Sequence, residues 1–175
     1  MSADYRYPIG KYIPQPFSQT LLQQWILDIQ YLPQHIETAV ANLDANQLHT
    51  PYREGGWTVH QVVHHLADSH MNSFIRFKLA LTETKPTIKP YDEVAWAAMP
   101  DVTLVPINMS ITLLHALHNR WTVLLKNITT NEFDNTIIHP ETNREMTVWF
   151  LLGLYAWHSR HHTAHITALK ERMNW

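Results

Sequence analysis

Four histidines near the C-terminus repeat at the spacing of an α-helix. They are His158, His161, His162 and His165, all within eight residues. Because an α-helix turns about 100° per residue, His158 and His162 lie one turn apart on one face, as do His161 and His165. The four rings therefore share one stripe about 100° wide. Two imidazoles one turn apart can chelate a metal ion, so this spacing predicts both a helix and a metal site.

Three further segments have apolar residues at steps of three and four, so that four long helices are predicted in all. They are expected over residues 18–43, 58–82, 110–129 and 147–173. Only 4 glycines occur among the 175 residues, which disfavours a turn-rich β architecture. Thr58 and Gln61 have the spacing of a capping box at the start of the second helix. Pro33 is expected to kink or interrupt the first helix.

The segments between these helices also carry structural signals. Residues 84–109 contain four prolines and predict a long crossover connection, with a short helix over 92–99, which could cover a functional site. Residues 133–146 predict a short hairpin with its turn at 140–143. The expected fold is therefore an all-α four-helix bundle with a long crossover and a hairpin before the last helix, forming a single domain over 1–175.

Charge and composition exclude several classes of partner. The net charge is −2 and no run of Lys or Arg occurs, so neither nucleic acid nor a membrane surface is expected as a partner. The longest apolar run, 148–157, is too short to cross a bilayer, and the N-terminus lacks the pattern of a secretory signal. These features predict a cytoplasmic protein. The chain has no cysteine, so it offers no thiolate ligand and no cysteine nucleophile.

A third metal ligand is expected from the second predicted helix, which carries several histidines. On a helical projection His65 lies just off the edge of the apolar face, beside Asn72 and Arg76. A ligand in a pocket that solvent can reach should lie at such an edge, next to other polar groups. His65 is therefore the favoured ligand, and Arg76 and Asn72 are candidate catalytic or substrate-binding residues. A surface salt bridge is the competing interpretation for Arg76.

The other histidines of this helix have different environments. His70 projects from the middle of the apolar face, which fits either a hydrogen-bonded core histidine or a residue that supports a metal ligand. His64 projects from the opposite edge near Asp68, which fits a solvated face.

Several motifs in this order resemble the DinB/YfiT superfamily, most closely the YfiT-type metal-dependent hydrolases. The segments that carry the resemblance cover nearly the whole chain. They are Gly-Gly-Trp-Thr-Val at 55–59, His-His-Leu-Ala-Asp at 64–68, His-Ser-Arg-His-His at 158–162, and the shorter matches at 7–10, 69–73, 75–83, 89–93 and 139–140.

The resemblance implies a helical bundle that holds one divalent metal ion, zinc or nickel, on three histidines. Carried over residue by residue, the ligands are His65, His158 and His162, whereas His165 matches a position that is not a ligand in the family pattern. His161 and His165 are then expected to orient the site rather than to bind metal. The resemblance further implies a cytoplasmic protein that is often a homodimer.

Three functions remain open at this point. A hydrolase would use the metal to activate water on a small-molecule substrate. A thiol S-transferase, as in relatives that use bacillithiol, would use the metal to activate a low-molecular-weight thiol. The segment between His158 and His162 holds no carboxylate to act as a general base, which favours transfer. A non-catalytic, metal-stabilised binding or dimerisation module is the third possibility.

Overall fold

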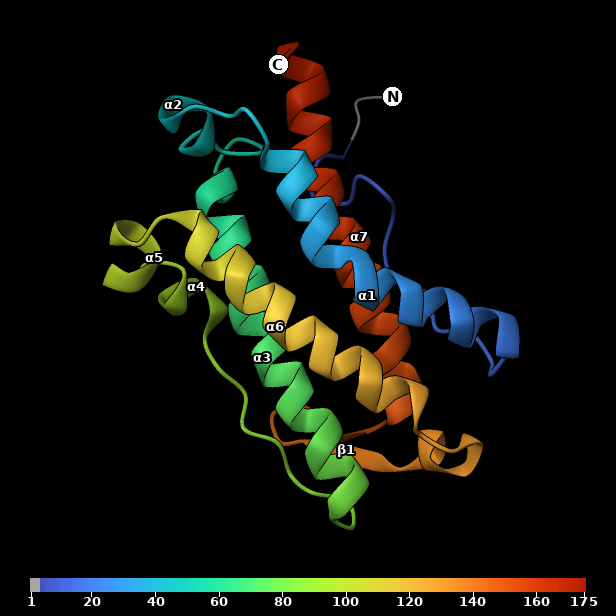
Figure 1. Ribbon diagram of the computed structural model, residues 1–175. Coiled ribbons are helices and arrows are strands. Elements are labelled where there is room, and N and C mark those ends of the chain that lie inside the picture. Colours follow the sequence, from blue (N-terminus) through green and yellow to red (C-terminus); the bar gives the residue numbers. More distant parts are fainter. Residues whose placement is uncertain (1–3) are drawn as a thin grey trace.

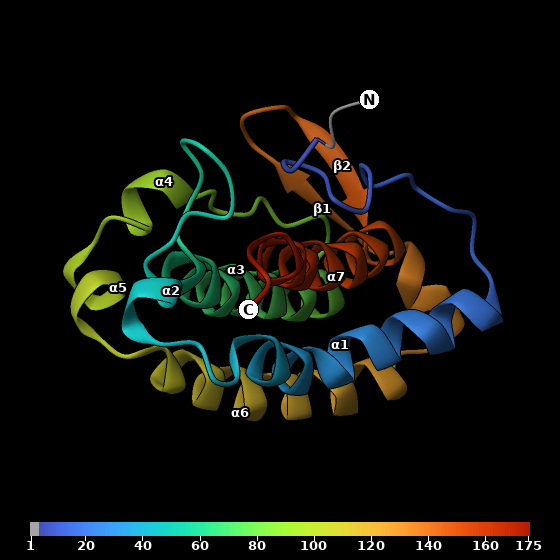
Figure 2. The same cartoon turned by 90° about the horizontal axis from the view of Figure 1, so that it is seen from above.

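Four long helices form a bundle of two layers in the computed structural model, which describes residues 4–175 (Figure 1). They are α1 (Gln19–Val40), α3 (Val59–Thr82), α6 (Ile107–Lys126) and α7 (Val148–Met173). Seen from above, α1 and α6 make one layer and α3 and α7 the other (Figure 2). Each helix packs on one helix of its own layer and one of the opposite layer. The predicted all-α four-helix bundle is confirmed.

Shorter elements connect the long helices. They are α2 (Ala45–Leu48), α4 (Glu93–Trp96), α5 (Pro100–Leu104), the 3-10 helix η1 (Thr130–Asp134), and the strands β1 (Thr136–His139) and β2 (Arg144–Thr147). The strands form the predicted antiparallel hairpin, with Thr136 opposite Thr147. In the turn, Asn143 adopts a positive φ of 48°, which asparagine tolerates better than most residues. Helix α2 was not predicted, because one helical turn has no periodicity to detect.

Side-chain caps fix where two of the long helices begin. The Thr58 hydroxyl accepts a hydrogen bond from the Gln61 N–H at 3.1 Å, and the Gln61 side chain accepts one from the Thr58 N–H at 3.0 Å. This confirms the predicted capping box at the start of α3. Thr147 caps α7 in the same way, accepting from the Phe150 N–H at 3.0 Å. Both caps lie on helices that carry the histidines of interest.

Helix α1 continues through Pro33 and changes direction along its length (Figure 1). Of the two outcomes expected at this proline, the structure shows a bend and not an interruption, because neighbouring helices hold both halves of α1 in place. The helix ends at Val40, three residues before the predicted end, and Asn42 just beyond it has a left-handed φ of 64°.

The connection between α3 and α6 runs back along the bundle, so that these two helices point the same way (Figure 1). This confirms the long crossover. The short helix expected over 92–99 covers only Glu93–Trp96. Helix α6 begins at Ile107, before the predicted start, with Pro106 at its N-cap position and no side-chain cap. Within residues 4–175, no helix combines the length and apolar character needed to cross a membrane.

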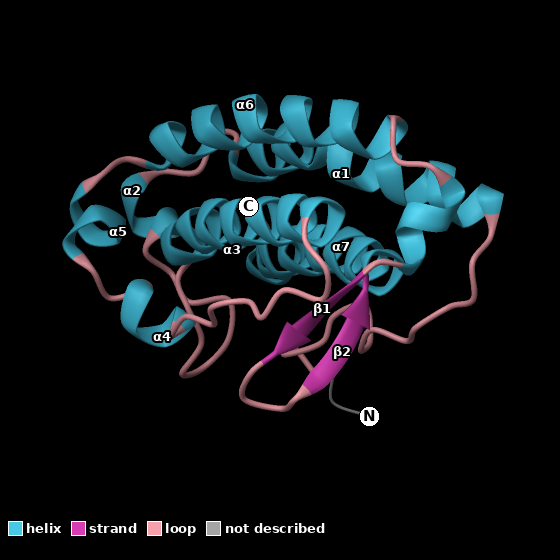
Figure 3. Ribbon diagram, turned by 90° about the horizontal axis from the view of Figure 1, so that it is seen from below, coloured by secondary structure: helices cyan, strands magenta, loops and turns pink. Residues whose placement is uncertain are grey.

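The outer face of the α3–α7 layer is covered by non-helical chain (Figure 3). The hairpin, the crossover and the N-terminal segment all lie on this side. Two tryptophans of α7 hold the N-terminal segment: Trp149 Nε1 donates to the Gln15 carbonyl at 2.8 Å, and Trp157 Nε1 donates to the Gly10 carbonyl at 3.1 Å. These coverings leave room for a pocket over the histidine stripe.

A layer of buried polar side chains divides the core into two apolar clusters. One cluster contains Phe74, Trp121 and Leu152, and the other contains Leu66 and Ile166. This layer contains histidines from three helices. His158 is partly buried, and the buried ones are His65, His70, His118, His161, His162 and His165. Histidine is seldom concentrated in a protein core, so this layer is the candidate functional site.

Candidate metal centre

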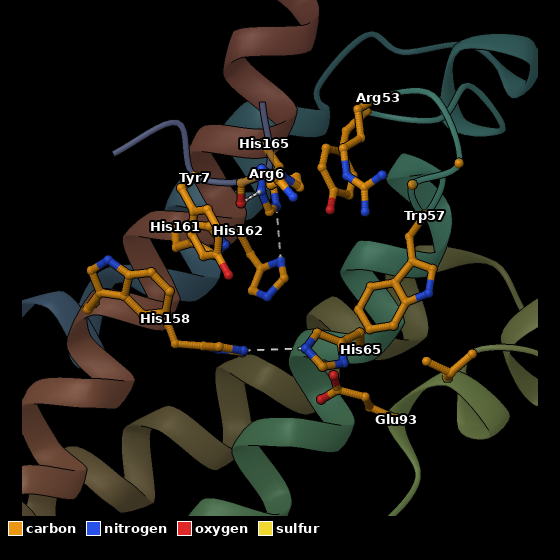
Figure 4. Close-up of a pocket in the computed structure, with 15 residues that line it drawn as sticks. Arg6, Tyr7, Arg53, Trp57, His65, Glu93, His158, His161, His162 and His165 are labelled. Carbon is orange, nitrogen blue, oxygen red and sulfur yellow. Dashed lines mark hydrogen bonds between the residues drawn. The ribbon is translucent and has the colours of Figure 1, made fainter. Parts of the chain in front are cut away.

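The structure brings together the three histidines that the sequence favoured as ligands. His65 of α3 and His158 and His162 of α7 each offer a ring nitrogen, and these nitrogens all lie within 4.8 Å of one another. His65 Nε2 and His158 Nε2 are 3.3 Å apart. Figure 4 shows the rings of His65 and His158 edge to edge with His162 above them. In the described part of the chain this is the one group of histidine or acidic side chains with metal-ligand spacing.

The spacing of the nitrogens fits a metal ion. A tetrahedral zinc ion with bonds of about 2.0–2.1 Å to imidazole nitrogens holds those nitrogens about 3.3–3.4 Å apart. The 3.3 Å between His65 Nε2 and His158 Nε2 matches that separation, and the His162 nitrogen lies within 4.8 Å of the other two. Three imidazoles on one ion leave a coordination position for water or substrate, as in catalytic zinc sites.

Burial keeps these histidines in the neutral form that binds metal. It lowers the pKa of His65 to about 4, with a smaller effect from the nearby His165. It also holds the pKa values of His158 and His162 well below the ordinary value of 6.5, again with smaller contributions from neighbouring histidines. Near neutral pH each of the three rings therefore has one unprotonated nitrogen, and its lone pair can bind a metal ion without first losing a proton.

A backbone carbonyl orients His162 through His165. The Nδ1 atoms of His162 and His165 are 3.3 Å apart, and His165 Nε2 lies 3.2 Å from the Arg6 carbonyl oxygen (Figure 4). A carbonyl only accepts, so His165 donates from Nε2 and accepts at Nδ1 from His162. His162 Nε2 is then free to bind metal. His165 thus orients one of the three clustered histidines, and Tyr52 stacks on its ring at 3.9 Å between ring centroids.

Two further buried histidines, His70 and His118, extend a row of ring-to-ring contacts from His158 into the core. His158 Nδ1 lies 3.1 Å from His70 Nε2, and His70 Nδ1 lies 3.1 Å from His118 Nε2. His70 is a hydrogen-bonded core histidine, as one of its two expected roles requires, and it also contacts His158, one of the three clustered histidines. Sequence reasoning missed His118. His118 is four residues after Leu114 and three before Trp121, and this spacing could have placed it on the buried face of α6.

An open pocket of about 520 Å³ lies over the three histidines. Trp57 and Trp157 form aromatic walls, and the Trp57 ring is 4.5 Å from that of His65. Glu93, at the start of α4, also lines the pocket, and its carboxylate points toward His65 in Figure 4. Sequence reasoning noted Glu93 only as part of a loop that could reach the site. The crossover places a carboxylate where the histidine motif has none.

Arg76 lies in a second pocket of about 500 Å³, which shares His158 and Glu93 with the first. Its guanidinium donates to the Tyr155 hydroxyl at 3.4 Å and to the Lys89 carbonyl at 3.5 Å. Asn72 instead donates its amide to the Asp68 carbonyl of its own helix at 2.9 Å. The two polar residues proposed beside His65 therefore have different surroundings, and Arg76 is the one that lines a pocket.

His64 is buried, so the solvated face expected for it is wrong. Its ring lies 2.7 Å from the Ser110 hydroxyl and 3.0 Å from the Val105 carbonyl. The segment that leads into α6 covers this edge of α3, a long-range contact that helical projection cannot reveal. Its neighbour Asp68 is partly buried as well, and burial raises the pKa of that carboxyl to about 6.

His161 is next to the metal ligands without joining them. Its ring stacks on Trp157 with centroids 4.4 Å apart and planes 17° apart. Its Nδ1 is buried and has no hydrogen-bond partner among the described residues. The role expected for His161, orienting the site without binding metal, stays a prediction.

The fold and the site together define a class: a helical-bundle protein with a cluster of three histidines at metal-ligand spacing, contributed by two helices. A family model of the DinB superfamily matches residues 29–166, and the chain belongs to that superfamily. A Bacillus cereus (strain ATCC 10987 / NRS 248) protein named "Putative metal-dependent hydrolase" is 53% identical over 173 residues, which is 98% of this chain and 99% of that protein. A Bacillus anthracis (strain CDC 684 / NRRL 3495) protein with the same name is 52% identical over the same shares.

A solved structure has the same fold. YfiT from Bacillus subtilis, described as a "probable metal-dependent hydrolase with an unusual four-helix bundle topology", superimposes with a TM-score of 0.96 at 50% identity. The match covers 98% of this chain and 99% of that one. The resemblance inferred from the sequence motifs is confirmed.

Proposed function

We propose that this protein is a metal-dependent hydrolase that acts on a small polar molecule. The observation that carries the proposal is the convergence of three neutral imidazoles, from His65, His158 and His162, beneath an open pocket. A divalent ion bound there, zinc or nickel, would act as a Lewis acid and would lower the pKa of a water molecule that it holds. The names of the relatives point to the same class.

Glu93 is the candidate general base. A base in this pocket must be a carboxylate or imidazole that is not itself a ligand and that can reach a water molecule beside the metal. Glu93 lines the pocket and its carboxylate points toward His65. Its side chain is exposed. Its position supports hydrolysis, the reaction that the lack of a carboxylate between His158 and His162 had disfavoured.

The second pocket is the candidate site for the rest of the substrate. His158 lines both pockets, so a substrate that reacts above His158 can extend toward Arg76. The Arg76 guanidinium has only two long hydrogen bonds and can bind an anionic group. Asp92 and Glu141 line the same pocket and favour a substrate with a donor or positive group as well.

Metal content tests the first part of the proposal. Protein purified without a tag is expected to hold close to stoichiometric divalent metal by elemental analysis. His65→Ala, His158→Ala and His162→Ala are each expected to lose most of it, because each removes one of three ligands. The matched control is His64→Ala, which removes a buried histidine of the same helix as His65 that is outside the cluster. Metal-free wild type, with ligand variants of unchanged stability, would end the metal hypothesis.

Turnover tests the second part. We expect metal-loaded protein to hydrolyse ester or amide substrates and to lose activity in a chelator. Glu93→Gln should lower kcat by about 10²–10⁴-fold while the protein keeps its metal, since general base catalysis contributes that much. Arg76→Met should raise KM more than it lowers kcat for anionic substrates. A Glu93→Gln variant with wild-type kcat would exclude that residue as the base.

Thiol S-transfer is the second candidate function. It is supported by the absence of cysteine from the chain, so a thiol could come only from a bound molecule, and by the aromatic walls of the pocket. Metal-dependent conjugation of bacillithiol to monochlorobimane, without ester or amide turnover, would select transfer. Turnover of neither kind would leave a metal-stabilised binding or dimerisation module.

A further inference from the structure

Pro33 leaves one backbone carbonyl in the core without its usual partner. In an α-helix the carbonyl of residue i accepts from the N–H of residue i+4, and proline has no N–H. Pro33 therefore cannot donate to the carbonyl of Ile29, although α1 continues through both residues. Ile29 is fully buried, and a buried carbonyl without a donor is costly.

His118 of α6 supplies the missing donor. Its Nδ1 lies within hydrogen-bonding distance of the Ile29 carbonyl oxygen, across the α1–α6 layer. A carbonyl can only accept, so the proton must be on His118 Nδ1. A neutral imidazole has one donor and one acceptor, which makes His118 Nε2 an acceptor.

The same donor and acceptor argument applies to each ring in turn, from His118 through His70 to His158. His118 Nε2 accepts from His70 Nδ1 at 3.1 Å, so His70 Nε2 is an acceptor. His70 Nε2 accepts from His158 Nδ1 at 3.1 Å, so His158 Nε2 holds a lone pair. That lone pair belongs to the atom 3.3 Å from His65 Nε2, in the position to bind metal. Each of the three rings has both nitrogens paired, and each therefore has a single allowed tautomer.

We propose that Pro33 is a positioning residue for the metal centre: by freeing the Ile29 carbonyl, it fixes the tautomers of His118, His70 and His158 in turn. The proposal rests on the proposed metal site, because it concerns which nitrogen of His158 binds the ion. The chain of imidazoles runs from α1 and α6 through the polar layer to the outer face of α7, where the pocket lies. Although proline disfavours a straight helix, Pro33 thereby determines which nitrogen of His158 faces the proposed metal site.

The first experiment compares His118→Phe with His118→Gln. Phenylalanine fills the space but can neither donate nor accept, whereas a glutamine amide has an NH2 group that donates beside a carbonyl oxygen that accepts. We expect zinc affinity, measured by competition with a chromophoric chelator, to fall about 10–100-fold in His118→Phe and to recover in His118→Gln. His64→Gln, which alters a buried histidine outside the chain of imidazoles, is the matched control and should bind zinc like wild type.

The second experiment restores the missing N–H. In Pro33→Ala, the new N–H can bond to the Ile29 carbonyl, straighten α1 and draw the carbonyl away from His118. A purely structural proline would give a variant as stable as wild type, or more stable, with unchanged metal affinity. We expect equal or greater stability with about tenfold or greater loss of zinc affinity.

The tautomers themselves can be read in the metal-free protein. Long-range ¹H–¹⁵N spectra of histidine-labelled protein distinguish protonated from unprotonated ring nitrogens. We expect His158 to be protonated at Nδ1 in wild type and in His118→Gln, and to become a mixture of tautomers in His118→Phe and Pro33→Ala. This readout needs no bound metal, so it separates failure of this inference from failure of the proposed function. A single unchanged His158 tautomer and unchanged zinc affinity in both His118→Phe and Pro33→Ala would overturn the inference.

Discussion

Acid should destabilise the metal-free protein through its buried histidines, and His118 is the one at which this effect can be isolated. Burial lowers the pKa of His118 to about 4, partly offset by its bond to the Ile29 carbonyl. The ordinary value is 6.5. As the pH falls below 6.5, the unfolded chain takes up a proton at this residue before the folded protein does. The stability that this neutral histidine contributes is therefore complete above pH 6.5 and is lost as the pH falls toward 4.

The size of this loss follows from the gap between the two pKa values. The gap is about 2.5 pH units, and each unit corresponds to about 1.4 kcal/mol, so the full effect is about 3 kcal/mol at pH 4 and below. At about pH 5 roughly 2 kcal/mol of it is already lost. His118 is almost fully buried, so solvent screening does not reduce this figure appreciably.

Urea unfolding of wild type and His118→Gln, with metal removed, measures this contribution. Glutamine does not titrate, so its unfolding free energy should fall less than that of wild type between about pH 7 and about pH 5. We expect the stability gap between the two proteins to shift by about 2 kcal/mol in favour of the variant. The other buried histidines are common to both proteins and cancel, apart from the smaller contribution that His118 makes to the lowered pKa of His70. A gap that shifts by less than about 0.5 kcal/mol, the usual error of such comparisons, would refute the reasoning.

Two further substitutions test how the helices are held. Gly153→Ala should destabilise the protein by about 1–3 kcal/mol, because a Cβ there would meet the Tyr12 hydroxyl and lie 2.7 Å from a Trp25 ring carbon; thermal unfolding measures this, and an unchanged Tm would contradict the crowding. Thr58→Ala should cost about 1 kcal/mol by removing the cap of α3; urea unfolding tests it, and Thr58→Ser should retain most of the stability.

The sequence could predict those features that depend on one helix at a time. The chelate of His158 and His162 follows from the turn of a single helix, and so does the position of His65 at the edge of an apolar face. The capping box at Thr58 and the hairpin turn are local for the same reason. Zinc or nickel as the metal, a homodimer and a cytoplasmic location stay predictions.

The features that were missed depend on contacts between distant segments. Glu93 reaches the pocket because the crossover folds back over α3, and His64 is buried because the segment before α6 covers it. No pattern within α6 indicates that His118 meets a carbonyl of α1. Periodicity places a residue on a face of its helix, but it does not say which segment will cover that face.

The residues that fit local rules least well lie along one line through the molecule. Pro33 is inside a helix, His70 and His118 are histidines in an apolar core, and His158 interrupts the apolar face of α7. Leucine or alanine at these positions would be expected to make a more stable bundle. Natural sequences break such rules chiefly at functional sites. The three histidines and the Ile29 carbonyl that Pro33 leaves free form one hydrogen-bonded chain that ends at the proposed metal site. A single requirement, one lone pair held in one direction, therefore accounts for all four exceptions.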